Sequence, residues 1–302
     1  MSNKDLSEFL KAKGLPFFEN APLAPLTTFK IGGNADVLCE PQELSQLKAL
    51  LSFLRDNKIP YFILGNGSNI LVSDKGVAGA VISLKNFNKI EAESSLEITC
   101  EAGQRLSKLC FFALEQNLSG LENLWGIPGT VGGAVYMNAG AYGSEIGDVL
   151  KECTFIDEAG QVVQADVSSL KLQYRSSIFT GTSKVILSAK FHLKPERHEN
   201  IKETMDDLMN RRREKQPLEY PSAGSTFKRP QGYYAGALIE ECGLKGACVG
   251  GAEVSEKHAG FIINKGGATS HDVLSLIEKC KREVFLQKSV TLEPEVKFIG
   301  RQ

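Results

Sequence analysis

The sequence predicts an α+β fold with a larger N-terminal region followed by a smaller C-terminal domain. Helical and strand patterns alternate irregularly along all 302 residues, and no repeat period is present. The 29 glycines are unevenly placed: thirteen lie in 65–147, ten in 224–267 and none in 182–223. Because a chain of this length usually forms about two domains, we place a hinge in the glycine-free stretch, between regions 1–195 and 196–302.

The helices expected in the first region have leucines at three- and four-residue spacing. This spacing puts one apolar stripe on a helix over 41–57, and a similar pattern predicts a helix over 105–117. Short apolar or alternating runs bounded by turn residues predict strands at 61–64, 70–73, 77–84, 96–101, 154–157, 161–165 and 184–193. We expect two subdomains here, at about 1–72 and 73–195.

A strongly charged helix leads into the second region. It is expected over 196–215, where Pro217 follows and stops it. The remaining elements are expected as a short helix at 234–242, a strand at 261–264, a helix from 271 to about 286 begun by Thr269 or Ser270, and a last strand over 290–299. We expect this last strand to return toward the first region.

Charge and cysteine patterns exclude several classes of protein. Lys and Arg number 35 against 36 Asp and Glu, so no basic excess favours nucleic acid, and the basic run 211–213 is interleaved with acids. The seven cysteines include no CxxC and the four histidines no HxxxH, so no metal site is expected. Scattered thiols, a charged N-terminus and the lack of a membrane-spanning run predict a cytoplasmic protein.

Two glycine-rich segments, 65–69 and 125–143, are candidates for ligand binding. The first does not fit the dinucleotide fingerprint, because its third glycine position is Ile70 and a strand follows instead of a helix. Amides and small side chains can still form an anion nest or pack against a planar ligand. Tight-turn chemistry and close packing of loops are the plainer alternatives. We expect both segments to be loops built on strands.

Six ordered motifs resemble those of the UDP-N-acetylenolpyruvoylglucosamine reductase family. They are TTFKIGG at 27–33, GNGSN at 65–69, GIPGTVGG at 126–133, YRSS at 174–177, PSAGSTFK at 221–228 and LEPEVKFIG at 292–300. The resemblance implies a flavin domain of the PCMH/vanillyl-alcohol-oxidase type followed by a smaller α+β substrate domain. It also implies an enzyme that uses FAD and NADPH to reduce an enolpyruvyl UDP-sugar in peptidoglycan precursor synthesis.

The resemblance assigns the FAD contacts to the glycine-rich segments and to the first motif. They are Ile31, Gly65, Asn66, Gly67, Ser68, Asn69, Ile127, Pro128, Gly129, Thr130, Gly132, Gly133, Ala139, Gly140 and Ala141. All four histidines lie outside the two glycine-rich segments, so we expect FAD to be bound noncovalently.

The resemblance assigns the chemistry to Arg175, Ser225 and Glu295. Arg175 has a charged fork that suits the substrate carboxylate, and Ser225 matches the family's proton donor. Glu295 would assist as a protonated acid that donates a hydrogen bond. Taken singly, these residues are more simply explained as a surface arginine, a turn serine and a solvated edge carboxylate.

Four further residues are expected to contact the substrate: Tyr174, Lys228, Arg229 and His258. Lys228 and Arg229 would bind the diphosphate as cations. Arg229 departs from the family pattern that has Asn after the Lys, and a surface or capping role is an equal alternative for His258.

The segment between Tyr174 and Ser225 is too short for the insertion that one branch of the family folds over its substrate. We therefore expect the shorter branch, as a monomer or weak oligomer. Two alternatives stay open. An FAD-dependent alcohol or lactone oxidase would leave the motifs around Ser225 and Glu295 unexplained. A flavin-binding or sugar-nucleotide-sensing protein without catalysis would be favoured if Arg175, Ser225 or Glu295 were missing, and all three are present.

Overall fold

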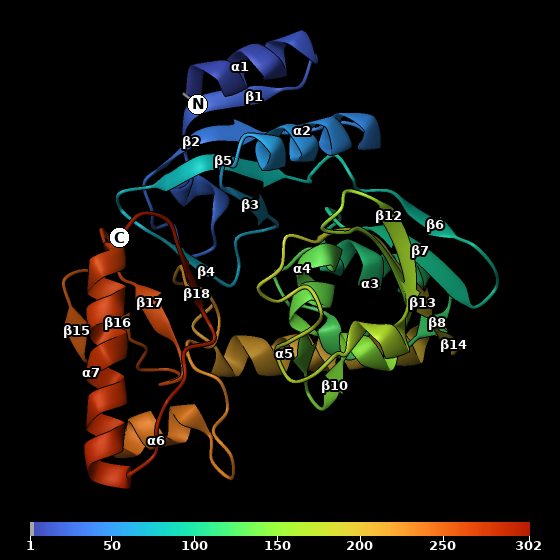
Figure 1. The fold of residues 1–302 in the computed structure, drawn as a ribbon. Helices are drawn as coiled ribbons and strands as arrows, with labels where there is room; N and C mark the ends of the chain where they lie inside the picture. The colour runs from blue at the N-terminus through green and yellow to red at the C-terminus, as the bar shows by residue number, and fades with distance from the viewer. Residues whose placement is uncertain (1–2) are drawn as a thin grey trace. The chain divides into compact units, whose positions relative to one another are not determined.

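Residues 3–302 are described by a computed structural model, in which the chain divides into two compact units (Figure 1). The first unit takes the residues up to Phe18, Leu38–Asn66 and Val81–Arg211. The second takes Glu19–Val37, Gly67–Ala80 and Arg212–Gln302. The first two residues of the predicted region 1–195 lie outside the described residues.

The first unit contains a five-stranded antiparallel sheet in the order β12-β11-β13-β7-β6. These strands are Val162–Asp166, Leu150–Ile156, Val185–His192, Glu97–Glu101 and Ile90–Ala92. Helix α4 (Val131–Met137) packs against β13 and β7, and α3 (Leu106–Glu115) packs against α4. Apolar side chains along β13 are buried, which is the alternation that predicts this strand.

Several shorter elements complete the first part of the chain. They are α1 (Asn3–Ala12), α2 (Leu44–Asp56), β8 (Leu118–Ser119) paired with β14 (Lys194–Pro195), and β9 (Gly140–Ala141) paired with β10 (Ser144–Glu145). A four-stranded sheet has the order β1-β2-β5-β3, formed by Phe17–Pro22, Asn34–Cys39, Val77–Ser83 and Tyr61–Leu64.

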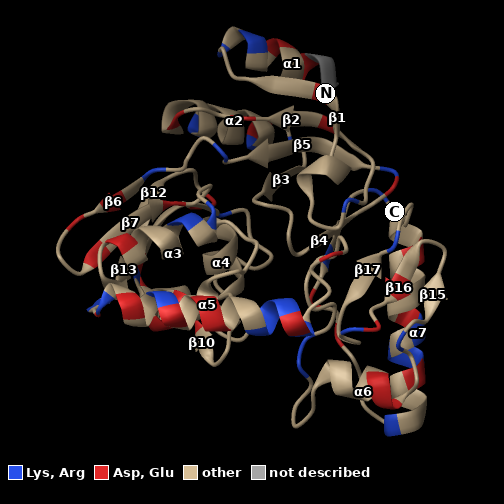
Figure 2. Ribbon diagram, turned by 180° about the vertical axis from the view of Figure 1, so that it is seen from behind, with Lys and Arg blue, Asp and Glu red and all other residues tan. Residues whose placement is uncertain are grey.

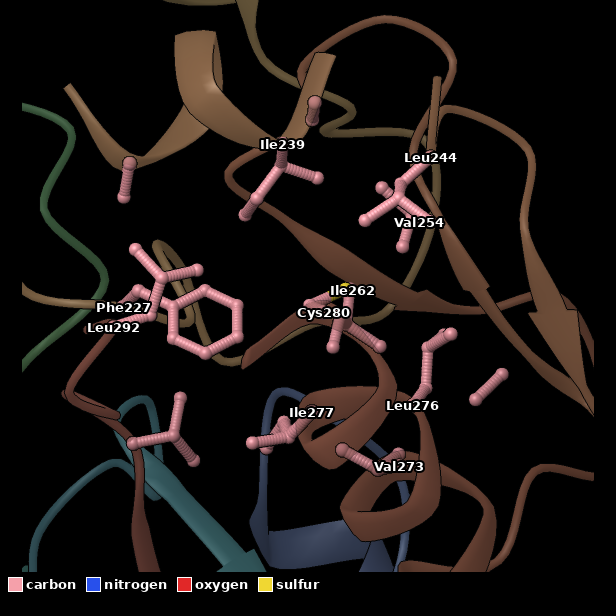
Figure 3. Packing of buried hydrophobic residues seen from close by; sticks show 14 of the residues in the cluster. Phe227, Ile239, Leu244, Val254, Ile262, Val273, Leu276, Ile277, Cys280 and Leu292 are labelled. Atoms are coloured by element: carbon pink, nitrogen blue, oxygen red, sulfur yellow. The ribbon is translucent and has the colours of Figure 1, made fainter. Parts of the chain in front are cut away.

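The core of the second unit lies between α6 (Ala235–Glu241), α7 (Ser270–Lys288) and a three-stranded antiparallel sheet. The sheet is formed by β15 (Cys248–Val249), β16 (Ala252–Val254) and β17 (Ile262–Asn264), and β4 (Ile70–Val72) pairs in parallel with β18 (Lys297–Ile299). Figure 3 shows Phe227 in this core together with Ile239 of α6 and Ile277 of α7. Thr269 begins α7 with a capping box, as predicted.

Helix α5 (His198–Lys215) is the charged helix predicted from the sequence. Figure 2 shows acidic and basic residues intermixed along it, and Arg211 pairs with Asp207 one turn earlier at 2.8 Å. This is the pattern of a solvated helix face. Within residues 3–302, no helix has the length and apolar content needed to cross a bilayer.

Two predictions about secondary structure are wrong. The strand expected over 290–299 is limited to Lys297–Ile299, because Pro294 has no N–H to donate to a continuous ladder. The second glycine-rich segment is not entirely a loop, since it contains α4. β11 begins four residues earlier than predicted. The elements without a prediction are α1, β1, β2, β6, β15, β16 and the two-residue strands β8, β9, β10 and β14.

Candidate active site

In the first unit the two glycine-rich segments meet. Asn66 Nδ2 donates to the carbonyl oxygen of Pro128 across 2.6 Å. A Cβ on Gly65 would lie 2.7 Å from Thr130 Oγ1, so glycine is required there by close approach. We call residues 65–66 and 127–133 the glycine cradle.

The start of α4 forms one side of the glycine cradle. Thr130 Oγ1 accepts from the Gly133 amide at 3.3 Å, and the amides of Val131 and Gly132 donate to Gln104 and Ala102 at 2.9 and 2.8 Å. Because these first-turn amides are bound within the protein, α4 does not offer the open N-terminus of a Rossmann phosphate site. Exposed Gly133 has only Thr130 Oγ1 within 4 Å of an added Cβ, at 3.4 Å, which leaves room for a ligand.

The other residues of the first glycine-rich segment are held within the second unit. The Gly67 carbonyl accepts from the Thr28 amide at 3.2 Å, and Asn69 Nδ2 donates to the Glu295 carbonyl at 3.3 Å. Ile31 is 2% exposed and lies in the core of this unit. The expected FAD contacts are therefore divided: Ile31, Gly67, Ser68 and Asn69 belong to the second unit and the others to the first.

Tyr174 and Arg175 are the two central residues of a tight turn in the first unit. The Gln173 amide donates to Ser176 O and the Ser176 amide to Gln173 O, both at 3.0 Å. Arg175 has φ +56°, in the left-handed region that favours glycine. Its Nη2 donates to Gly140 O at 3.1 Å, and its guanidinium carbon lies 4.8 Å from the centroid of the Tyr174 ring. A strained backbone conformation at a residue with a long charged side chain suggests a functional constraint.

Asn138 connects this turn to the second glycine-rich segment, and the sequence analysis missed its role. It is fully buried and has φ +41° at the C-terminal end of α4. Its Nδ2 donates to Gln173 O at 3.3 Å, and its Oδ1 accepts from the Gly147 amide at 3.0 Å. An Asn after a helix is a recognised left-handed cap, but that signal depends on predicting α4.

The residues that follow Asn138 continue this arrangement. Gly140 and Ala141 form β9, and a Cβ on Gly140 would lie 2.5 Å from Ser144 O on β10. Glycine is therefore needed here for strand packing, while the Gly140 carbonyl receives the guanidinium of Arg175.

In the second unit, Ser225, Lys228 and Glu295 lie on two segments that run side by side. The Glu295 amide donates to Thr226 O, and the Lys228 amide donates to Glu293 O, both at 2.8 Å. Ser225 is exposed after Gly224, whose φ is +75°. Among residues 3–302, its hydroxyl has no hydrogen-bond partner, which leaves it available to a ligand.

The two cations expected at the diphosphate already have partners in the second unit. Lys228 Nζ forms an ion pair with Glu293, whose side chain is exposed. Arg229 Nε donates to Tyr233 O at 3.3 Å, and its guanidinium lies 4.0 Å from the centroid of the Tyr234 ring. Such exposed contacts are weak, so either cation can exchange them for a phosphate.

His258 is half-buried in the second unit and accepts a hydrogen bond from the chain. Its Nδ1 accepts from the Gly260 amide at 3.0 Å, and its ring meets the Phe261 ring edge-on with centroids 5.0 Å apart. Burial lowers the pKa of His258, so the neutral ring is the favoured form. This arrangement supports the structural alternative for His258 that the sequence left open.

Two sequence profiles match the chain. A profile of the C-terminal domain of UDP-N-acetylenolpyruvoylglucosamine reductase matches residues 216–299, and a profile of an FAD binding domain matches residues 35–166.

The chain is also similar to known proteins over nearly its whole length. It is 48% identical over 300 residues to the UDP-N-acetylenolpyruvoylglucosamine reductase of Clostridium novyi (strain NT), covering 99% of this chain and 97% of that protein. The crystal structure of UDP-N-acetylenolpyruvylglucosamine reductase from Thermus caldophilus superposes with a TM-score of 0.80 at 35% identity, covering 94% of this chain and 98% of that one.

A more distant likeness concerns the fold alone. Wild-type BBE-like 1 of Physcomitrella patens gives a TM-score of 0.50 at 14% identity, covering 65% of this chain and 45% of that one. Together with the FAD binding profile, this likeness confirms the predicted α+β fold with a flavin domain and a second domain.

Proposed function

The chain belongs to the UDP-N-acetylenolpyruvoylglucosamine reductase family, FAD-dependent oxidoreductases of peptidoglycan synthesis, and from that premise we propose how its own residues act. In this proposal NADPH is the hydride donor, the enolpyruvyl ether of UDP-N-acetylglucosamine is the acceptor, and Arg175, Ser225 and Glu295 carry out the chemistry. The observation that supports it most is the side-by-side pairing of residues 226–228 with 293–295, which sets Glu295 opposite Thr226, the residue after Ser225.

The glycine cradle fits a flavin. Gly65 has no space for a Cβ against Thr130 and Asn66 binds Pro128, so the two segments are held together, while exposed Gly133 leaves open space beside them. The FAD contacts expected from the sequence remain our proposal for this chain. Bound FAD supplies hydride transfer from the nicotinamide to the enolpyruvyl carbon, and the protein supplies orientation and charge.

Arg175 is proposed to hold the substrate carboxylate. Hydride addition to the distal vinyl carbon leaves negative charge on the other vinyl carbon and the carboxylate, and a guanidinium fork stabilises that charge. The tight turn fixes the backbone of Arg175, because two hydrogen bonds join Gln173 and Ser176 on either side of the central pair.

Ser225 is proposed to deliver the proton to carbon. Its exposed hydroxyl, on the residue after a left-handed glycine, is not engaged by the described chain. Glu295 is proposed to assist as a protonated carboxyl. Its backbone is fixed on both sides, by Thr226 O at the amide and by Asn69 Nδ2 at the carbonyl. Lys228 would exchange Glu293 for the diphosphate.

We also propose that the enzyme acts in the cytoplasm, as a monomer or weak oligomer. All seven cysteines are free, and burial raises the pKa of Cys39, Cys100, Cys153 and Cys280 to about 12. Thiols of this kind are inert side chains of the core, which suits a reducing compartment.

One experiment separates the proposal from its alternatives. The purified protein is expected to be yellow, to be reduced by NADPH, and to oxidise NADPH continuously only when the enolpyruvyl UDP-sugar is added. Oxygen-dependent turnover of an alcohol or lactone without NADPH would favour an oxidase, and a protein that binds the substrate without reducing it would favour a sensor.

The role of Ser225 is tested by separating the half-reactions. Ser225→Ala is expected to leave reduction of the flavin by NADPH near normal and to slow its reoxidation by the substrate severely. Ser222→Ala is a matched control, because Thr28 Oγ1 donates to the Ser222 carbonyl, which the substitution keeps. Fast reoxidation in Ser225→Ala would show that another group donates the proton.

A further inference from the structure

The ring of His258 closes a short turn in the second unit. The His258 carbonyl accepts from the Phe261 amide at 2.9 Å, while Nδ1 accepts from the Gly260 amide at 3.0 Å. Ser255 fixes the start of this turn, since its Oγ accepts from the His258 amide at 3.3 Å. The ring of His258 therefore holds the Gly260 amide, and its carbonyl holds the next amide, that of Phe261.

The Gly260 peptide in turn holds the residue next to Ser225. Its carbonyl accepts from the Thr226 amide at 2.8 Å, and Thr226 Oγ1 accepts from the Ile262 amide at 3.0 Å. Thr226 is 1% exposed, and its carbonyl accepts from the Glu295 amide. Two hydrogen bonds, joined through the backbone of Gly260, thus connect the imidazole to the backbone that carries Ser225.

The space around the ring admits few other arrangements. A Cβ on Gly236 of α6 would lie 3.2 Å from His258 Cε1, and a Cβ on Gly260 would lie 2.9 Å from the same atom. Phe261 meets the ring edge-on from the other end of the turn. Glycines on two sides thus let the backbone approach the imidazole closely, and an aromatic ring packs beside it.

We propose that His258 is a positioning residue for the proton donor: its neutral Nδ1 holds the Gly260 amide, the Gly260 carbonyl holds the Thr226 amide, and Thr226 in turn sets the place of the Ser225 hydroxyl. This inference rests on the proposed role of Ser225. It replaces the expected contact of His258 with the substrate by a role carried through the chain.

The arrangement makes the position of Ser225 sensitive to protonation of the ring. A protonated imidazole carries a hydrogen on Nδ1, which would face the hydrogen of the Gly260 amide and end that bond. Burial is the main cause that lowers the pKa of His258, and the charge of Lys245 adds to it. A hydrogen bond with the backbone of His258 opposes them, and so does the charge of Glu240 of α6, which pairs with Lys245 at 2.7 Å. The bond is therefore kept at neutral pH and lost in acid.

The test compares two replacements of His258 in the FAD-loaded enzyme. His258→Phe keeps an aromatic ring without the acceptor, while His258→Asn keeps an acceptor at the position of Nδ1. We expect His258→Phe to slow flavin reoxidation by the substrate about tenfold or more and to leave flavin reduction by NADPH unchanged. His258→Asn should restore most of the rate and remove the acid inflection of reoxidation attributed to His258. His271→Asn, an exposed histidine on α7, is the matched control.

Hydrogen exchange gives a readout that does not depend on activity. Exchange of the amides in residues 224–228, measured by mass spectrometry, should be faster in His258→Phe and near wild type in His258→Asn. Unchanged amide exchange of residues 224–228 in His258→Phe would overturn the inference, whatever substrate the enzyme reduces. Equal slowing of both half-reactions, or equal slowing in both variants, would overturn it too. Loss of substrate reduction in the wild type would instead contradict the proposed function, and the exchange data would still decide the role of His258.

Discussion

The left-handed conformation of Arg175 gives a prediction that separates stability from function. With φ +56°, any residue that has a Cβ is strained there by about 1–2 kcal/mol. Replacement by glycine removes this strain, but glycine also has more freedom in the unfolded chain, which costs roughly 0.5–1 kcal/mol. Arg175→Ala keeps the strain, and both variants lose the hydrogen bond to Gly140 O.

The difference in unfolding free energy between the two variants therefore isolates the effect of the left-handed backbone at this position. Arg175→Gly should be more stable than Arg175→Ala by about 0.5–1 kcal/mol, which for a chain of this size raises the melting temperature by about 2 °C. Urea and thermal unfolding of the apoproteins measure this directly. Both variants should slow flavin reoxidation by the substrate about a hundredfold or more, since neither has a cation for the developing charge.

Two results would refute this reasoning. If Arg175→Gly is no more stable than Arg175→Ala, the turn does not strain its third residue as the observed φ implies. If Arg175→Gly keeps wild-type reoxidation, the guanidinium is not what stabilises the charge on the substrate. Arg175→Lys is the control that keeps the positive charge without the fork, and an intermediate rate is expected from it.

Three further predictions concern other parts of the chain. Asn138→Ala should lower the free energy of unfolding by about 2–4 kcal/mol, because it leaves two hydrogen bonds unmade in a buried site and strains the backbone; urea unfolding measures this, and a loss below 1 kcal/mol would contradict it. Gly65→Ala should lower the amount of flavin that copurifies, because its Cβ would lie 2.7 Å from Thr130 Oγ1; a normal flavin absorbance per protein would contradict it. Asp272→Ala should lower stability by about 0.5–1 kcal/mol at neutral pH. The hydrogen bond from the Thr269 amide lowers the pKa of Asp272 in the folded protein. The stability difference should therefore be present above about pH 4, where an unfolded aspartate is ionised, and vanish as the pH falls through the depressed pKa. A difference independent of pH would contradict this.

Elements that carry their own periodicity could be predicted from the sequence. Helices α2 and α7 have apolar stripes with clear ends, and the capping box of Thr269 and Asp272 marks the start of α7. Helix α4 has two glycines in its first turn, so local propensity disfavours it. It forms because Thr130 caps it and because β13 and β7 bury its apolar face, and neither contact is visible from the local sequence.

The sequence indicates candidate residues for the site, but it does not indicate which other residues they contact. The motifs contain Arg175, Ser225 and Glu295, but nothing in their spacing indicates that Glu293 pairs with Lys228 or that His258 holds the Gly260 peptide. The first contact joins residues 65 positions apart, and the second depends on how the chain turns between residues 258 and 260. The sequence therefore assigns Lys228 and His258 to the substrate without indicating their partners within the protein.

Pro294 shows how such a long-range contact can be fixed by one residue. The antiparallel bridge between Phe227 and Pro294 is flanked by bonds from the Lys228 amide to Glu293 O and from the Glu295 amide to Thr226 O. Pro294 thus occupies a position where the ladder needs no N–H. A register that placed Pro294 at a hydrogen-bonded position would leave a carbonyl of the partner segment without its donor, so proline disfavours such pairings and is compatible with the one that sets Glu295 beside Thr226. The proline that interrupts the predicted strand thus agrees with the pairing that holds Ser225 and Glu295 on neighbouring segments.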